Sequence, residues 1–159
     1  MATIRPATPE DTTEIVAMIH ELAEFERAAD HCTVTEKQLT AALFSTSPSV
    51  RGHIAESDGQ IVAMALWFPS FSTWDGVKGI YLEDLYVRPA FRRRGLARSL
   101  LATLAAECLD NGYTRLSWAV LNWNSNAIAL YDAIGAQPQR EWTTYRLSGP
   151  ELAALAEPR

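Results

Sequence analysis

The chain has 159 residues, of which 48% are hydrophobic and 21% are charged, and its net charge at pH 7 is -5. This is the composition of a globular protein, so it excludes a disordered chain. The acidic balance argues against a nucleic-acid partner, and the length favours one domain over residues 1–159.

The first half of the chain predicts a strand, two helices and a hairpin. Residues 4–7 are expected to form a short strand, after which Thr8 caps a first helix. Thr35 begins a second, shorter helix with the capping-box pattern. Asp58-Gly59 between two apolar runs, 53–56 and 60–68, is typical of a hairpin turn. The apolar residues of the first helix recur every three or four positions: Ile15, Met18, Ile19, Leu22 and Phe25.

The second half alternates strands and helices. After an expected loop at 69–79, residues 80–87 predict a strand and 95–109 an amphipathic helix. Residues 116–121 predict another strand, and a further helix is expected from Asn124 or Ser125 to Ile134, with Gly135 behind it. A last strand is expected at 141–147. This order predicts an α+β fold with a mixed, mostly antiparallel sheet flanked by helices.

The cysteines and histidines are too scattered to predict a metal site. Cys32 and Cys108 fit no metal or redox spacing. Cys108 falls on an apolar helical stripe, which indicates a core position. The sequence therefore predicts no metal.

No apolar run approaches the length that a membrane span needs, and residues 1–6 lack an apolar signal core. We therefore expect no membrane partner and a cytoplasmic location in a reducing compartment.

A basic turn joins the strand 80–87 to the helix that follows it. Arg92, Arg93 and Arg94 precede Gly95 at the start of that helix. Unpaired N–H groups and the helix dipole make such a helix start a phosphate site. A solvated charge run is the plain alternative. The spacing does not fit a dinucleotide-binding loop, and the absence of Gly-Lys-Ser/Thr excludes a P-loop.

Two further groups of residues are candidates for binding. Asn124 and Asn126 stand at a predicted helix start, where capping is their usual task, and Tyr131 follows in a position that also suits a core tyrosine. Glu83 and Asp84 are adjacent in a strand, so we expect them to face opposite sides of the sheet. One would form an ion pair, and the other would project into a cleft.

With these motifs in view, the chain resembles the GNAT superfamily of N-acetyltransferases, and within it the diamine acetyltransferases of the spermidine/spermine and thialysine branches. The likeness covers nearly the full length. It is carried by the segments 4–8, 21–26, 35–36, 72–74, 81–87, 119–124 and 130–136.

The resemblance implies a GNAT fold and acetyl-CoA as cosubstrate. The backbone of the strand would hold the pantetheine arm, the basic turn the pyrophosphate, and Tyr131 would lie near the sulfur. The residues implied in acetyl-CoA binding are Leu85, Tyr86, Val87, Arg92, Arg93, Arg94, Gly95, Leu96, Ala97, Asn124, Asn126 and Tyr131. Those implied in amine binding are Glu26, Trp74, Glu83 and Asp84.

The reaction so implied is direct attack of an amine on the thioester. Because an alkyl amine has a pKa near 10.4, only about one molecule in a thousand is unprotonated at neutral pH. Glu83, directly or through water, is the expected base, the N–H near Leu85 the oxyanion donor, and Tyr131 the acid that protonates the leaving thiolate.

The substrate is expected to be a short diamine or a lysine-like amino acid. Residues 27–30 are less acidic than the corresponding run in the family, so a long polyamine would gain less here. Acetylation of a protein or peptide, or a non-catalytic acyl-CoA-binding module, are the alternatives. The aromatic residues Trp67, Phe68, Phe71 and Trp74 favour a closed small-molecule pocket over a peptide groove. The resemblance also implies a homodimer.

Overall fold

The computed structural model describes all residues 1–159. By packing, the chain divides into two compact units, Met1–Trp123 and Asn124–Arg159. The first unit contains the whole sheet and three helices. The expectation of a single domain stays a prediction.

The sheet has five strands in the order β1-β2-β3-β4-β5. The first four pair antiparallel, and β5 runs parallel to β4, which confirms the mixed, mostly antiparallel α+β sheet. The strands are β1 (Thr3–Pro6), β2 (Arg51–Ser57), β3 (Gln60–Ser72), β4 (Val77–Val87) and β5 (Leu116–Ser117).

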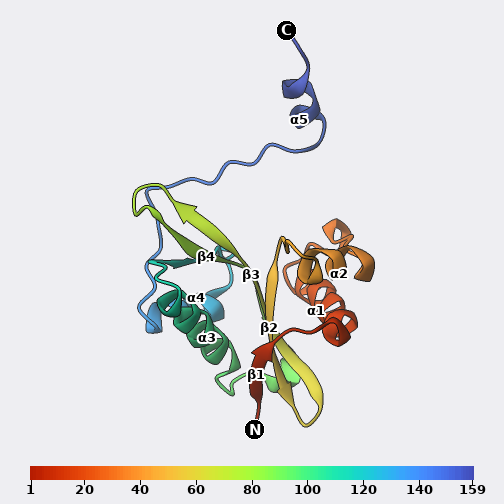
Figure 1. Cartoon of the computed structure of the whole chain (residues 1–159), viewed down its shortest axis with the longest axis vertical. Helices are drawn as coiled ribbons and strands as arrows, with labels where there is room; N and C mark the ends of the chain where they lie inside the picture. The colour runs from red at the N-terminus through yellow and green to blue at the C-terminus, as the bar shows by residue number, and fades with distance from the viewer. The chain divides into compact units, whose positions relative to one another are not determined.

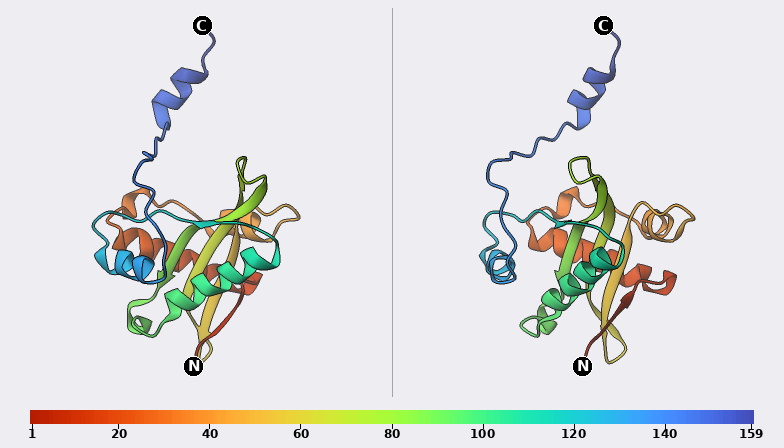
Figure 2. Two further views of the ribbon diagram at one scale, coloured as in Figure 1. Left: turned by 90° about the vertical axis from the view of Figure 1, so that its left-hand side faces the viewer. Right: turned by 60° about the vertical axis from the view of Figure 1, so that its left-hand side comes forward.

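Helices cover both faces of this sheet. In the first unit α1 (Thr12–Phe25) and α2 (Glu36–Phe44) lie on one face and α3 (Leu96–Asp110) on the other (Figures 1 and 2). Three short 3-10 turns join these elements: η1 (Pro9–Asp11), η2 (Ala29–His31) and η3 (Pro89–Phe91). The second unit contains α4 (Ser125–Ala133) and α5 (Gly149–Ala156).

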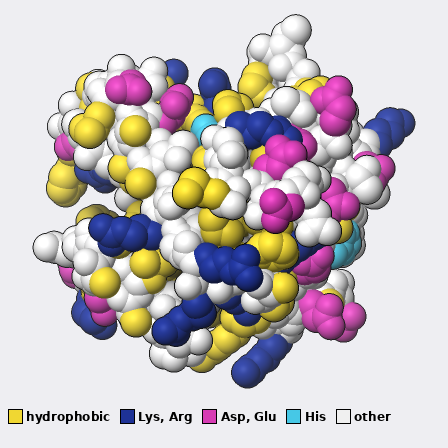
Figure 3. Space-filling model, turned by 90° about the horizontal axis from the view of Figure 1, so that it is seen from below, with side chains coloured by type: hydrophobic (Ala, Val, Ile, Leu, Met, Phe, Trp, Pro, Cys, Tyr) yellow, Lys and Arg dark blue, Asp and Glu magenta, His cyan; other side chains and the backbone are white.

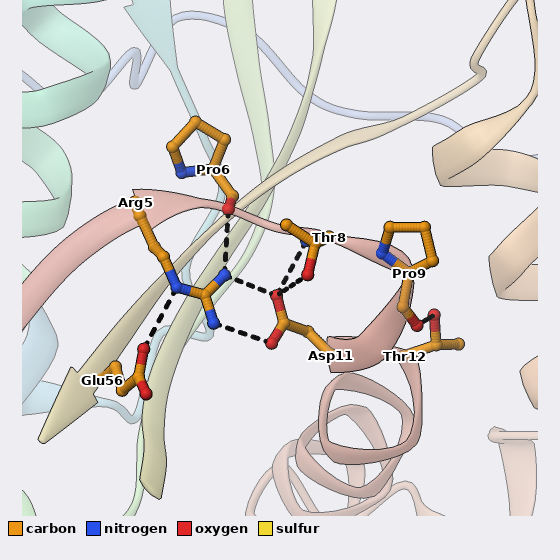
Figure 4. A network of polar contacts seen from close by, with 7 residues as sticks. All are labelled: Arg5, Pro6, Thr8, Pro9, Asp11, Thr12 and Glu56. Carbon is orange, nitrogen blue, oxygen red and sulfur yellow. Dashed lines mark hydrogen bonds and ion pairs between the residues drawn. The ribbon is translucent and has the colours of Figure 1, made fainter. Parts of the chain in front are cut away.

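Local sequence signals define the helix starts, although Thr8 caps the 3-10 turn η1 and Asp11 is the N-cap of α1. Asp11 accepts two hydrogen bonds from the Arg5 guanidinium, at 2.8 and 3.0 Å, and one from the Thr8 backbone N–H at 2.8 Å. Arg5 also donates to Glu56 on β2 at 3.1 Å, so one guanidinium joins β1, β2 and the start of α1 (Figure 4). The Arg5 hydrogen bonds hold the pKa of Asp11 below its usual value. Thr35 caps α2 by accepting from the N–H of Gln38.

The core lies between the sheet and its two helical layers. The face covered by α1 and α2 buries apolar side chains from both helices and from β2, β3 and β4: Ile15, Met18, Leu22, Leu39, Leu43, Ile54, Met64, Leu66 and Tyr86. On α3 the buried side chains are Leu96, Leu100, Leu101, Leu104 and Cys108, so the core position predicted for Cys108 is confirmed. No helix is both long and apolar enough to cross a membrane.

Three sequence predictions are wrong. Residues 69–79 are mostly strand instead of loop, because Pro69–Ser72 on β3 pairs with Val77–Ile80 on β4. The strand predicted at 116–121 is limited to Leu116–Ser117, and no strand forms at 141–147. A strand needs a hydrogen-bonded neighbour, and these alternating patterns lack one over most of their length.

Candidate functional site

The site begins at an exposed length of backbone on β4. Pairing with β5 is limited to Ile80 and Tyr81, whereas β3 follows β4 as far as Val87. We call the side of residues 82–87 that faces away from β3 the open edge of β4. A strand edge of this kind presents N–H and C=O groups that an extended ligand can pair with.

The register shows which groups the open edge presents. The Arg88 N–H donates to the Val62 carbonyl on β3 at 2.9 Å. Because backbone groups of successive strand residues point to alternate sides, those of Val87 and Leu85 point away from β3. They are the two residues whose backbone was predicted to hold a pantetheine arm.

A bulge interrupts β4 at Glu83. Asp84 pairs with Leu66 and Leu82 with Trp67, so Glu83 has no partner on β3. The bulge takes Glu83 out of the regular pairing of β4, and neither carboxylate forms the ion pair that was expected. Bulges bend a strand and re-aim its side chains, and they are frequent beside active sites. Nothing in the residue types signals this bulge.

Three carboxylates lie close together beside the bulge. Asp84 is mostly buried, and desolvation, followed by the charges of Glu83 and Glu26, raises its pKa to about 6. Burial also raises the pKa of Glu26, the C-cap residue directly after α1. Glu83 itself is exposed. Negative charge held at low dielectric without a protein cation suits a cationic or proton-donating ligand.

The basic turn follows the open edge directly. Arg92, Arg93 and Arg94 are all exposed, and Gly95 takes a left-handed conformation (φ 77°) at the N-cap of α3. Arg93 is also left-handed, with φ 65°. Successive N–H groups in such a turn form an anion-binding concavity, and the first N–H groups of α3 have no intrahelical acceptor. Leu96 is buried and anchors the helix start.

One face of the molecule shows where the basic side chains lie. On the face drawn in Figure 3, Lys and Arg side chains gather across the middle, and Asp and Glu side chains collect mainly towards one side. Lys and Arg side chains that lie together on a net-negative protein favour an anion locally.

An ion-pair cluster that sequence reasoning missed holds the far end of β4. Arg88 donates to Glu14 at 2.7 Å and to Glu21 at 3.1 Å, both on α1, and to the Ile61 carbonyl at 2.9 Å. These contacts fix β4 against α1 immediately before the basic turn. Only the spacing of Glu14 and Glu21, two helical turns apart, could have suggested the cluster.

The second unit carries the remaining predicted residues. Asn124 caps α4, accepting from the Ala127 N–H at 3.3 Å, and Asn126 is exposed in the first turn. Tyr131 is half-buried in the same helix. Tyr131 lies seven positions after Asn124, so the two lie on one face, two turns or roughly 10 Å apart.

The aromatic residues expected around a pocket are dispersed. Trp67 is buried and Phe68 packs on Tyr81 with ring centroids 5.3 Å apart. Phe71, near the end of β3, is 63% exposed. Trp74, in the turn that joins β3 to β4, is 88% exposed. Trp74 is roughly 25 Å along the strand from Asp84, so the two do not meet in one chain. The closed aromatic pocket is a wrong prediction.

Comparison with known proteins identifies close relatives. Residues 15–136 match the acetyltransferase (GNAT) family. A thialysine N-epsilon-acetyltransferase of Caenorhabditis elegans is 40% identical over 94% of both chains, and one of Bos taurus is 37% identical over 96% of both. An L-ornithine N5-acetyltransferase of Arabidopsis thaliana is 30% identical, covering 96% of this chain and 86% of the relative.

Solved structures share the same architecture. An integron cassette protein from the mobile metagenome of V. cholerae superposes with a TM-score of 0.83 at 25% identity, covering 99% of this chain and 98% of the other.

Proposed function

Because the chain belongs to the acetyltransferase (GNAT) family and is an amine N-acetyltransferase, we propose that it acetylates the terminal amine of a short diamine or a lysine-like amino acid. The observation that carries the proposal is the meeting of the carboxylates Glu26, Glu83 and Asp84 with the open edge of β4. The named activities of the relatives, on thialysine and on ornithine, support the amine class.

Acetyl-CoA, the cosubstrate of the family, supplies an activated acetyl group. We assign its pantetheine arm to the outward-pointing backbone of Leu85 and Val87, beside Tyr86. Its pyrophosphate is assigned to the turn residues Arg92, Arg93, Arg94, Gly95, Leu96 and Ala97. Left-handed Gly95 and the α3 N-terminus support this assignment, because both present N–H groups to an anion.

The carboxylates have separate tasks in this proposal. Asp84, with a pKa of about 6, is mostly ionised at pH 7 and holds the ammonium group together with Glu26. Glu83, exposed at the bulge, removes the proton directly or through water. The neutral amine then attacks the carbonyl carbon, and the Leu85 N–H donates to the developing oxyanion.

Residues of the second unit complete the proposal. Tyr131 protonates the departing thiolate, whose ordinary pKa of about 8.5 makes it a fair leaving group. Asn124 and Asn126 are assigned to the pantetheine arm. Trp74 stays a proposed amine contact, and its place at the hairpin turn separates it from the carboxylates of its own chain.

A homodimer and a cytoplasmic location complete the proposed setting. The two free cysteines, Cys32 and Cys108, are compatible with a reducing compartment. Light scattering measures the molar mass of the purified chain in solution. We expect the mass of two copies.

An amine panel tests the substrate class. Thiol release from acetyl-CoA is followed with thialysine, ornithine, lysine, putrescine, spermine and a lysine-containing peptide, and the products are identified by mass spectrometry. We expect kcat/KM to be highest for the lysine-like amino acids or the short diamine. A higher kcat/KM for the peptide would favour a protein acetyltransferase. The aromatic residues do not exclude this alternative, because they are dispersed and form no closed pocket. Bound acetyl-CoA without thiol release for any amine would favour a binding module.

A further inference from the structure

Five side chains of the first unit, two arginines and three aromatic residues, form a continuous row. The Arg27 guanidinium lies 4.7 Å from the centroid of the Trp123 ring, which is 5.7 Å from that of Phe25. The Arg92 guanidinium lies 5.2 Å from the Phe25 ring and 5.7 Å from the Tyr86 ring. We call this set the arginine–aromatic row. At these distances each guanidinium is attracted to the faces of the rings.

The row joins the two ends of the proposed site. Phe25 is the last residue of α1, and the next residue is Glu26, one of the three clustered carboxylates. Arg92 belongs to the basic turn, and Tyr86 lies on β4 between the two residues assigned to the pantetheine arm. A contact between Phe25 and Arg92 therefore connects the amine side to the pyrophosphate side.

The Arg92 guanidinium is held on two sides. Its Nε donates to the Val87 carbonyl at 2.9 Å, at the open edge of β4. Its flat face is shared by Phe25 and Tyr86. The side chain is exposed, and its two terminal nitrogens make no hydrogen bond within the protein, so their N–H groups can all be offered to an anion.

We propose that Phe25 is a positioning residue for the cosubstrate: by stacking on Arg92, it orients the terminal N–H groups that receive the pyrophosphate. Because linkage is reciprocal, an anion that fixes Arg92 also fixes Phe25 and the adjoining Glu26. Binding of CoA and of the amine are then positively coupled. This inference rests on the proposed function.

Simple packing is a weaker account of the Phe25 position. The side chain is 40% exposed at the end of α1, so it buries less than a core phenylalanine does. Arg92 has neither an acidic partner nor a buried location to hold it. The aromatic faces are thus its only restraint besides the Val87 carbonyl.

Calorimetric titration of CoA tests the proposal at low ionic strength, with the wild type, Phe25→Leu, Arg92→Ala and the double variant. An exposed cation–π contact corresponds to about twofold to fivefold in affinity, so Phe25→Leu should weaken CoA binding by that factor. In the double variant the second change should add nothing to the loss from Arg92→Ala. Unchanged binding by Phe25→Leu, or losses that simply multiply, would overturn the proposal.

Matched variants separate the orientation of the Arg92 guanidinium from its charge, and both from a general loss of packing. Arg92→Lys keeps the charge but not the flat stacked group, and should lose most of what Arg92→Ala loses. Arg51→Lys changes an exposed arginine that lies 5.7 Å from the Trp67 ring, outside the assigned site, and should bind CoA as the wild type does. Phe71→Leu, at an exposed aromatic residue of the hairpin, should also leave CoA binding unchanged.

The coupling itself is measured by titrating ornithine with and without saturating CoA. The wild type should bind ornithine at least about twofold more tightly with CoA present, and Phe25→Leu should show no such gain. Equal gains in both proteins would refute the role of Phe25. A wild type that binds no CoA would overturn the proposed function and this inference together, whereas normal CoA binding by Phe25→Leu would remove the inference alone.

Discussion

Asp84 and Glu26 lie close together in the fold although they are far apart in the chain, and the charge of Glu26 helps to raise the pKa of Asp84 to about 6. Burial is the larger cause of the shift. An ionised Asp84 therefore lowers the stability of the fold, and a neutral side chain at this position would be more stable. Sites that sacrifice stability in this way are commonly functional.

Replacement of Asp84 by Asn should stabilise the fold and weaken the enzyme. The folded-state pKa lies above the unfolded value of about 3.9, so ionised Asp84 costs stability above pH 6 and none below about pH 4. Asp84→Asn should gain up to about 2–3 kcal/mol at pH 7.5 and lose the gain at pH 4. Urea unfolding at both pH values measures it.

The control for this change is Asp132→Asn, at an exposed position of α4. It should leave the unfolding midpoint unchanged at both pH values. The amine KM of Asp84→Asn should rise about tenfold, the equivalent of one charge-assisted hydrogen bond. A variant that gains stability but keeps its KM would remove Asp84 from the amine site.

Tyr131→Phe should lower turnover without weakening the binding of CoA. Loss of a general acid typically costs about 10²-fold in rate or more, while the ring and its packing are retained. Steady-state kinetics together with a CoA titration separates the two effects. Tyr113→Phe, which removes a hydroxyl at the turn after α3, serves as the control and should leave kcat unchanged. If Tyr131→Phe turns over as fast as Tyr113→Phe, Tyr131 is not the acid.

A buried histidine should make the fold sensitive to acid. His53 is only 8% exposed, accepts a hydrogen bond from Trp67 Nε1 at 3.1 Å, and burial lowers its pKa. The unfolded chain takes up a proton near pH 6.5 and the folded chain at lower pH, so stability is full above pH 6.5 and falls as the pH drops below it. Urea unfolding at pH 7.5 and 5.5, followed by tryptophan fluorescence, shows this loss.

His53→Phe identifies the origin of that acid sensitivity. It should cost about 1–3 kcal/mol at pH 7.5, because the buried Trp67 N–H loses its acceptor. The variant should also unfold with less dependence on pH between 7.5 and 5.5. An unchanged pH dependence would show that another group is responsible.

Gly79→Ala should disrupt the short pairing of β4 with β5. A Cβ at Gly79 would lie 2.7 Å from the Arg115 carbonyl oxygen, a backbone atom beside the only parallel pairs of the sheet. We expect a loss of about 1–3 kcal/mol, as for other overpacked sites. Gly52→Ala meets only side-chain atoms, at 3.1 Å from Leu66 or farther, and should cost less. Equal unfolding midpoints for both variants would contradict this view of the β4–β5 junction.

Local signals in the sequence predicted the helix starts and the first hairpin. The Thr35 capping box, the Asp58-Gly59 turn and the Asn124 cap each depend on residues within four positions, so the pattern alone determines them. Chain-distant pairing was harder. Ser, Gly and aromatic residues made 69–79 look like a loop, and only the match of β3 with β4 makes most of it strand.

The residues of the candidate site are a prediction from the sequence, whereas their arrangement is visible only in the fold. Motifs located Glu83, Asp84 and the basic turn, because their spacing is local. The bulge at Glu83 arises from a register shift against β3, and the raised pKa of Asp84 depends on Glu26 at the end of α1. Neither can be inferred without the neighbouring element. The same holds for the contact of Arg92 with Phe25.

A crystal structure of the chain with CoA and ornithine would show whether the open edge of β4 holds the cosubstrate. We expect pantetheine amides within about 3 Å of the outward backbone groups of Leu85 and Val87, and the terminal amine at Glu83 and Asp84. Pantetheine bound away from the open edge of β4, or an amine remote from both carboxylates, would contradict it.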